Sequence, residues 1–204
     1  MFLLDGSGSL NTLDFENSID FVKQIVATFD LRKNKIGIMQ FSHWFRNRVD
    51  ARQDYLKTEI RLGQFASHIR FNLAADSIRH HGFTTYTAHA IDQAVRVDLA
   101  TSDRFSNPCT KKAIVVITDG PATDSSLILA KANAARDRNV VLFAVGVRRY
   151  EITQLQEIAN GVEGSNRRVY TSRDYIGLHS IVPMLRDELH NLLSDGSVTN
   201  MSAP

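Results

Sequence analysis

Three short segments of the sequence are rich in oxygen-bearing side chains that suit a hard metal ion. The first offers Asp5, Ser7 and Ser9, separated by two glycines that let the backbone bend tightly. Because alternate side chains of an extended turn point the same way, we expect these three to act together. The second segment is rich in threonine and the third holds one aspartate. Their candidate residues are Thr84, Thr85, Thr87 and Asp119.

This donor set predicts the class of metal. No His or Cys stands at these positions with ligand-like spacing, which disfavours zinc and softer metals. Carboxylates with hydroxyls suit a small cation that keeps several waters, so the sequence favours Mg²⁺, with Mn²⁺ or Ca²⁺ as alternatives. Of the five candidate ligands, counting one threonine, only Asp5 and Asp119 carry charge. A cation held in this way should attract an anionic oxygen from outside.

The three segments lie where strands are predicted to end or helices to begin. Apolar runs alternate along the chain with stretches whose apolar residues recur at helical spacing. The predicted strands are 2–4, 35–41, 113–118, 140–147 and 168–171, with a short edge strand at 48–50. The predicted helices lie within 15–29, 55–71, 90–99, 125–138, 152–159 and 175–193. This order predicts an α/β fold with a doubly wound, mostly parallel sheet flanked by helices and one short antiparallel edge strand. Ligands of such sheets bind beyond the carboxyl ends of the strands, where these loops converge.

Taken together, the motifs resemble those of a known family. Asp5-Gly6-Ser7-Gly8-Ser9 matches a DxSxS motif, and Thr85-Tyr86-Thr87 is similar to a threonine loop. Thr118-Asp119-Gly120 resembles a TDG signature after a buried strand. This combination is similar to the von Willebrand factor type A (VWA), or integrin I-like, domain with its metal-ion-dependent adhesion site. The resemblance extends over about residues 2–193 and includes Val145-Gly146-Val147.

The resemblance implies a role for each candidate ligand. Ser7, Ser9 and Thr85 would bind the metal directly, and Asp5 and Asp119 would act largely through water. A protein partner would complete the coordination with a Glu or Asp. The implied function is therefore metal-dependent binding of a matrix or cell-surface protein, and not catalysis.

The resemblance also implies domain limits and a location. A single VWA domain would occupy residues 1–193, with its first strand truncated at the start, and 194–204 would be a linker or tail. The run LLDGSGSL resembles extracellular members of the family, and Asn200-Met201-Ser202 matches a glycosylation acceptor. We therefore expect a secreted or cell-surface protein. The last predicted helix would shift in an activation switch.

Single residues near these motifs also have simpler interpretations. The DxSxS loop alone would suit a helix N-cap, and Asp124 and Ser125 are expected to be ordinary caps of the helix that follows them. Trp44 is expected to pack and not to recognise a partner. Four side chains near the threonine loop are the candidates for partner contact: His80, His81, Tyr86 and His89.

Composition narrows the other functions. The chain has 204 residues and a formal net charge of +2, and its dibasic pairs lie in separate segments, so we expect no nucleic-acid binding. A glycosaminoglycan is the alternative anionic partner. No apolar run approaches the roughly 18 residues of a membrane span, and the lone Cys109 permits no internal disulfide. The motifs GxxxxGK[ST] and GxSxG are absent, which makes a Mg²⁺-dependent hydrolase the weaker alternative, beside a structural VWA domain of a multiprotein assembly.

Overall fold

A six-stranded sheet forms the centre of the molecule. The structure is a computed structural model that describes residues 1–47, 53–160 and 166–194. The strand order is β3-β2-β1-β4-β5-β6, and among these strands the β2–β3 pair is antiparallel while the others are parallel. The strands are β1 (Phe2–Asp5), β2 (Ile38–Phe41), β3 (Leu56–Ile60), β4 (Lys112–Thr118), β5 (Val140–Val147) and β6 (Val169–Ser172). The predicted α/β doubly wound fold with one antiparallel strand is confirmed.

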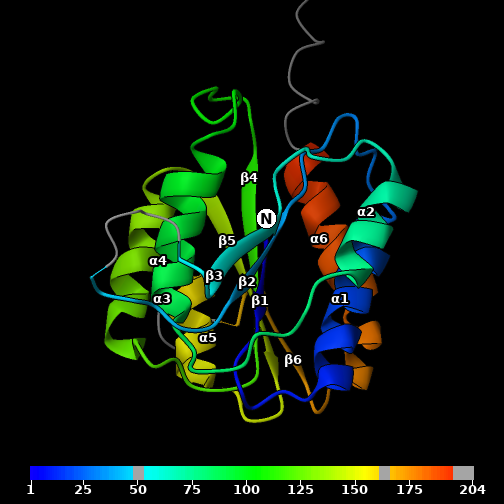
Figure 1. Cartoon of the computed structure of the whole chain (residues 1–204). Coiled ribbons are helices and arrows are strands. Elements are labelled where there is room, and N and C mark those ends of the chain that lie inside the picture. The colour runs from blue at the N-terminus through cyan, green and yellow to red at the C-terminus, as the bar shows by residue number, and fades with distance from the viewer. Residues whose placement is uncertain (48–52, 161–165, 195–204) are drawn as a thin grey trace, which may run out of the picture.

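Helices cover both faces of this sheet. Figure 1 shows α1, α2 and α6 on one side and α3, α4 and α5 on the other. Their bounds are α1 (Thr12–Val26), α2 (His68–Asp76), α3 (Thr87–Gln93), α4 (Ile128–Arg136), α5 (Ile152–Ala159) and α6 (Val182–Ser194). A π-helical turn, η1 (Ala94–Leu99), continues α3, and two 3₁₀ turns, η2 (Ser125–Leu127) and η3 (Ile176–Ser180), precede α4 and α6. None of the described helices is long and apolar enough to cross a membrane.

The two faces of the sheet bury separate apolar cores because neighbouring strand residues point to opposite sides. Phe2 and Leu4 of β1 pack into the core beneath α1 and α6, whereas Leu3 packs into the core beneath α3 and α4. The central strand β4 is apolar on both faces, as expected of a parallel strand covered by helices on both sides. The strand ends are therefore held firmly, and the loops that follow them start from fixed positions.

The structure corrects one predicted element. The segment 55–71, predicted to be one helix, contains strand β3 and then helix α2, with Gly63 between them at φ +71°. The buried residues of β3 are Leu56 and Ile60, four positions apart, and this spacing fits the period of a strand as well as that of a helix. Strand β3 supplies the antiparallel edge pairing. The edge strand predicted at 48–50 lies outside the described residues.

Candidate metal centre

The predicted ligands meet at the point where the strand order reverses. β1 pairs with β2 on one side and with β4 on the other, so the chain leaves β1 in one direction and returns across the sheet to β4. Asp5 is the last residue of β1, and Asp119 directly follows β4. In Figure 1 the loop after β1 lies at the lower end of the sheet. Open α/β sheets bind ligands at such a switch point, beyond the carboxyl ends of the strands.

Hydrogen bonds join four of the five predicted ligands into one chain. Asp5 Oδ1 accepts a hydrogen bond from the Ser7 backbone N–H at 2.9 Å. The Ser7 and Ser9 hydroxyl oxygens are 2.9 Å apart, and Ser9 Oγ donates to Asp119 Oδ1 at 2.7 Å. From the neighbouring strand, Thr118 Oγ1 donates to Asp5 Oδ2 at 2.7 Å. The network thus brings together residues that are more than 100 positions apart in the sequence.

The two carboxylates of this network carry charge in a poorly solvated place. Asp5 is 2% exposed and Asp119 is 6% exposed. Burial raises the pKa of Asp5 to about 6, against the opposing hydrogen bonds from Thr118 and Ser7, and the nearby charge of Asp119 adds to the rise. Burial also raises the pKa of Asp119, although the hydrogen bond from Ser9 and the charge of Arg148 lower it. Among the described residues neither carboxylate forms an ion pair. A bound cation would therefore stabilise the charged form of both and offset the cost of burying them.

The threonine loop lies against the loop that carries Asp119. Thr85 N–H donates to Thr123 Oγ1 at 3.2 Å, and Thr123 N–H donates to the Thr85 carbonyl at 2.7 Å. The Thr84 hydroxyl is 2.8 Å from His43 Nδ1, and Thr87 is fully buried at the start of α3. The Thr87 hydroxyl has no hydrogen-bond partner but is buried, whereas Thr85 is only half-buried, and this accessibility favours Thr85 over its neighbours. Its role as a ligand remains a prediction.

Three contacts tie the DxSxS loop to the segment before the threonines. Gly8 N–H donates to the Phe83 carbonyl at 2.8 Å, and Gly82 N–H donates to the Gly6 carbonyl at 2.9 Å. His80 Nε2 is 2.9 Å from the Ser7 carbonyl, and its ring stacks on a core phenylalanine of α1 at 5.1 Å. These contacts fix the spacing between the two loops, so the candidate ligand oxygens of both loops are held in place without a metal.

The side chains predicted to touch a partner are placed around these loops. His80 holds the Ser7 carbonyl, as described above, and His81 Nε2 is 3.4 Å from Glu59 Oε1. His89 Nδ1 is 2.7 Å from an oxygen of Asp124. Tyr86 is partly exposed beside Thr85. Three of the four thus have a polar partner within the domain and Tyr86 has ring contacts, while contact of all four with another protein stays a prediction.

Asp124 differs from its predicted role. It was expected to cap the helix that follows it, yet its side chain makes no capping bond to η2. Instead its carboxylate accepts hydrogen bonds from the backbone N–H groups of Ala88 and His89 at 3.1 and 2.9 Å, in the first turn of α3. The negative carboxylate suits the positive end of that helix, and this contact holds the start of α3 behind the threonine loop.

Sequence reasoning overlooked two further residues around the centre. Thr118 was noted only as part of a motif, although its hydroxyl bonds Asp5. Arg148, which forms a dibasic pair with Arg149 in the sequence, makes an ion pair with the buried Asp14. No local pattern signals a pair separated by 134 positions. The one sequence feature that would have suggested this ion pair is an acidic residue on the apolar face of the first turn of an amphipathic helix.

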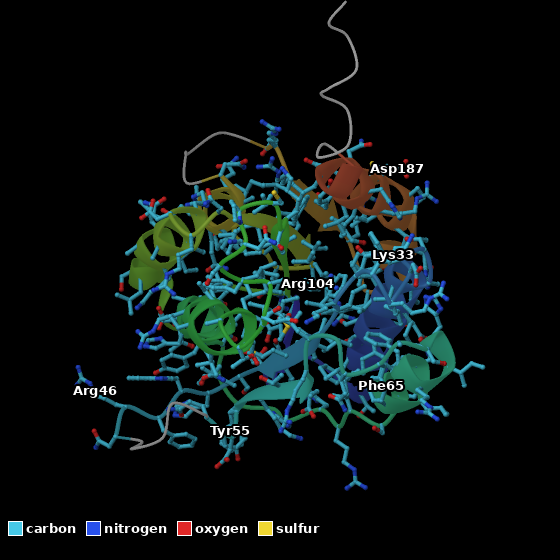
Figure 2. The ribbon with its side chains drawn as sticks, turned by 90° about the horizontal axis from the view of Figure 1, so that it is seen from above. Lys33, Arg46, Tyr55, Phe65, Arg104 and Asp187 are labelled. Atoms are coloured by element: carbon cyan, nitrogen blue, oxygen red, sulfur yellow. The ribbon has the colours of Figure 1, made fainter. Side chains whose placement is uncertain are left out.

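The donor chemistry fits a hard cation. Among the described residues, no group of three or more His, Cys, Asp or Glu is placed to hold a metal, so a zinc-type cluster is not formed there. The centre instead offers two carboxylates and several hydroxyls, a set that suits Mg²⁺ with retained waters. A pocket of about 350 Å³ lies at the other end of the sheet and contains none of these ligands. Figure 2 views that end, with Lys33 and Arg104 of the pocket labelled.

Comparison with known proteins agrees with this geometry. Residues 1–183 match the model of the von Willebrand factor type A domain. The chain belongs to this family. Its relatives include human collagen alpha-1(XXI), 33% identical over 93% of this chain and 18% of the collagen, and mouse integrin alpha-X, 28% identical over 93% of this chain and 16% of the integrin. These relatives are matrix and adhesion proteins and not enzymes. The VWA chain therefore spans less than a fifth of the length of either.

A solved structure shares the VWA fold. Proximal thread matrix protein 1 from the mussel byssus superposes with a TM-score of 0.78 at 20% identity, over 91% of this chain and 46% of that chain. One structure of that mussel protein has a zinc-occupied MIDAS motif, the metal-ion-dependent adhesion site.

Proposed function

We propose that this VWA domain binds Mg²⁺ and uses it to hold an acidic residue of a protein partner outside the cell. The proposed ligands are Asp5, Ser7, Ser9, Thr85 and Asp119. The observation that carries the proposal is the buried chain of hydrogen bonds from Asp5 through the two serines to Asp119. Two buried carboxylates with raised pKa values lie at a switch point, and no ion pair compensates them there among the described residues.

The choice of an acidic partner follows from charge. Two carboxylates that act largely through water leave a divalent cation with an open, positively charged position. An anionic oxygen is the ligand that such a position prefers. The collagen and integrin relatives support a matrix or cell-surface partner and an extracellular location. We further propose that the domain comprises residues 1–193, with 194–204 as a linker or tail.

A structural role without metal is the main competing function, and metal titration separates the two. Mg²⁺, Mn²⁺ and Ca²⁺ should each be titrated by calorimetry into the wild type and Asp119→Ala. The matched control is Asp187→Ala, because Asp187 is an exposed aspartate of α6 at the periphery of the molecule (Figure 2) and is not a proposed ligand. We expect saturable binding in the wild type and in Asp187→Ala and its loss in Asp119→Ala. If none of the three proteins binds any of the metals, the proposed metal centre is wrong.

The partner chemistry has its own test. A fluorescent hexapeptide with a central Glu and alanines elsewhere should bind in Mg²⁺, and the same peptide with Gln should not. Addition of EDTA should release the Glu peptide. Equal binding of the Glu and Gln peptides, or binding that survives EDTA, would exclude a metal-held carboxylate.

A further inference from the structure

A patch of aromatic side chains lies beside the candidate metal centre. We call it the aromatic surface and define it as the five residues His43, Phe45, Tyr55, Phe83 and Tyr86. Their ring centroids form a connected set, with separations of 4.7 Å for His43–Phe45, 5.2 Å for His43–Tyr86 and 4.7 Å for Tyr55–Phe83. Two further pairs connect the set, with centroid separations of 6.4 Å for His43–Phe83 and 5.7 Å for Phe45–Tyr55. Residues from two connections, one between β2 and β3 and one between α2 and α3, thus build one continuous aromatic patch.

This patch faces solvent and belongs to neither apolar core. Phe83 is 62% exposed and Phe45 is 39% exposed, and none of the five rings is a member of either core cluster. Figure 2 shows Tyr55 at the periphery of the molecule. Contiguous exposed apolar side chains contribute little to folding, and they commonly mark interaction sites.

The backbone of Phe83 is held in an unfavourable conformation. Its φ is +86°, in the left-handed region that favours glycine, and Gly82 before it has φ +80°. A bulky residue at positive φ is a genuine outlier, and such strain gathers at binding sites that the surrounding structure enforces. Here the enforcing contact is the hydrogen bond from Gly8 N–H to the Phe83 carbonyl at 2.8 Å. The loop thus presents an exposed phenyl ring at a cost in backbone energy.

The aromatic surface is continuous with the metal-binding loops. The Gly8–Phe83 hydrogen bond places Phe83 against the DxSxS loop itself. Thr84 bonds His43, and Tyr86 directly follows Thr85. Because neighbouring residues of a peptide are about 3.8 Å apart at their Cα atoms, a partner anchored on the metal places its next one or two residues over this patch.

We infer that the aromatic surface binds a large apolar side chain of the partner, one or two residues away from the acidic residue that the metal holds. The inference rests on the proposed function and specifies the partner as an extended segment with an acidic residue beside an apolar one. An anionic side chain at this place would lose water and meet the negative faces of the rings, and the Nδ1 atom of His43 already bonds the Thr84 hydroxyl. An apolar side chain is the occupant that these rings stabilise.

Labelled hexapeptides test the inference through fluorescence anisotropy in Mg²⁺. The probes are Ala-Ala-Glu-Leu-Ala-Ala, Ala-Ala-Glu-Ala-Leu-Ala and the all-alanine peptide with the same central Glu. We expect the better of the two leucine peptides to bind the wild type about tenfold more tightly than the alanine peptide, as partial burial of one Leu implies. Phe83→Gly should reduce this preference to about twofold or less, because glycine keeps the backbone conformation and removes the ring.

Matched controls separate this inference from the metal site and from the fold. Ile69→Ala removes a side chain that is 74% exposed on α2, outside the aromatic surface, and should keep the full preference. Phe45→Ser changes a second ring of the patch and should also weaken the preference. Calorimetric Mg²⁺ affinity should be the same in all four proteins. A loss of Mg²⁺ binding in Phe83→Gly would assign the ring to the metal loop and overturn the inference.

The remaining outcomes are also decisive. If the wild type binds the leucine and alanine peptides equally, in Mg²⁺ only, the proposed function stands and the inference is wrong. If no Glu peptide binds although Mg²⁺ does, both the acidic-partner proposal and the inference fail. Concentration-dependent dimerisation by analytical ultracentrifugation, lost in Phe83→Gly, would instead identify a second copy of the domain as the occupant and overturn the inference.

Discussion

Arg148 forms a two-pronged ion pair with Asp14, although 134 positions separate them in the sequence. Its two terminal nitrogens donate to the two carboxylate oxygens at 2.6 and 2.8 Å. Arg148 follows β5, and Asp14 lies in the first turn of α1, the helix that the DxSxS loop enters. The guanidinium also lies 5.4 Å from the ring centroid of Tyr175. This pair ties the start of α1 to the sheet, and with it the end of the DxSxS loop.

Removal of the Arg148 guanidinium alone should destabilise the domain more than removal of both the guanidinium and the Asp14 carboxylate. Asp14 is 5% exposed, so Arg148→Met leaves a carboxylate buried without its partner. Removing one member of a fully buried pair costs about 3–5 kcal/mol, and the side chain of Arg148 is 37% exposed, so we expect a loss of about 2 kcal/mol in unfolding free energy. Urea unfolding in EDTA measures it.

The control for this ion pair is the double variant Asp14→Asn/Arg148→Met. It should recover part of the lost stability, because no unpaired charge remains in it. An Arg148→Met protein as stable as the wild type would show that the pair contributes nothing to the position of α1.

The raised pKa of Asp5 predicts that the metal-free domain loses stability as the pH rises. Because the pKa is about 6 in the folded protein and 3.8 as the reference, the fold binds more protons than the unfolded chain between these values. The Asp5 carboxyl therefore does not lower the free energy of unfolding below pH 3.8. Above pH 6 it lowers the free energy of unfolding by its full amount, about 2–3 kcal/mol. Urea unfolding at pH 4.5 and 7.5 in EDTA measures the change.

Histidines titrate in the same range, so the informative quantity is the difference from Asp5→Asn. We expect this variant to be more stable than the wild type at pH 7.5 in EDTA and to approach it at low pH. The amide can still accept from the Ser7 N–H, and the Thr118 hydroxyl can turn to accept from the amide. Parallel pH profiles of the two proteins would show that Asp5 is not the group responsible.

The sequence predicts the meeting point of the candidate ligands better than it predicts the edge of the sheet. Asp5 and Asp119 follow buried apolar runs whose parallel pairing is a strong rule, so their meeting point can be inferred from topology. Leu56 and Ile60 do not discriminate strand from helix, because a spacing of four residues satisfies both periods. The Arg148–Asp14 pair and the strained Phe83 depend on long-range packing and backbone geometry, for which no local pattern exists.

Gly6 should tolerate no side chain, for a steric reason. A Cβ atom at this position would overlap the Gln40 amide and lie 2.6 Å from its Cγ. Gln40 is fully buried and cannot move freely, because its amide donates to the Arg79 carbonyl and accepts from the His81 N–H, each at 2.8 Å. We expect Gly6→Ala to lower the unfolding free energy by about 2 kcal/mol and to weaken Mg²⁺ binding, since the DxSxS loop must shift.

Gly120→Ala is the matched control, because a Cβ there meets no atom within 4 Å. It lies beside Asp119 on the other ligand loop and should change stability by less than about 0.5 kcal/mol. Thermal and urea unfolding of the two variants measure both effects. Equal stabilities of Gly6→Ala and Gly120→Ala would mean that Gln40 yields to the new methyl group, and that the loop is not confined by it.

Phe83 offers a test of strain that does not depend on any partner. Alanine and glycine at position 83 both remove the exposed ring, but only glycine adopts φ +86° without a steric penalty. The left-handed conformation costs other residues roughly 1–2 kcal/mol, and glycine loses part of that gain through the greater freedom of its unfolded chain. We therefore expect Phe83→Gly to exceed Phe83→Ala by about 1 kcal/mol in unfolding free energy, measured by urea denaturation at pH 7.5. If the alanine variant equals or exceeds the glycine variant, the Phe83 backbone is not strained, and the argument from strain for its binding role fails.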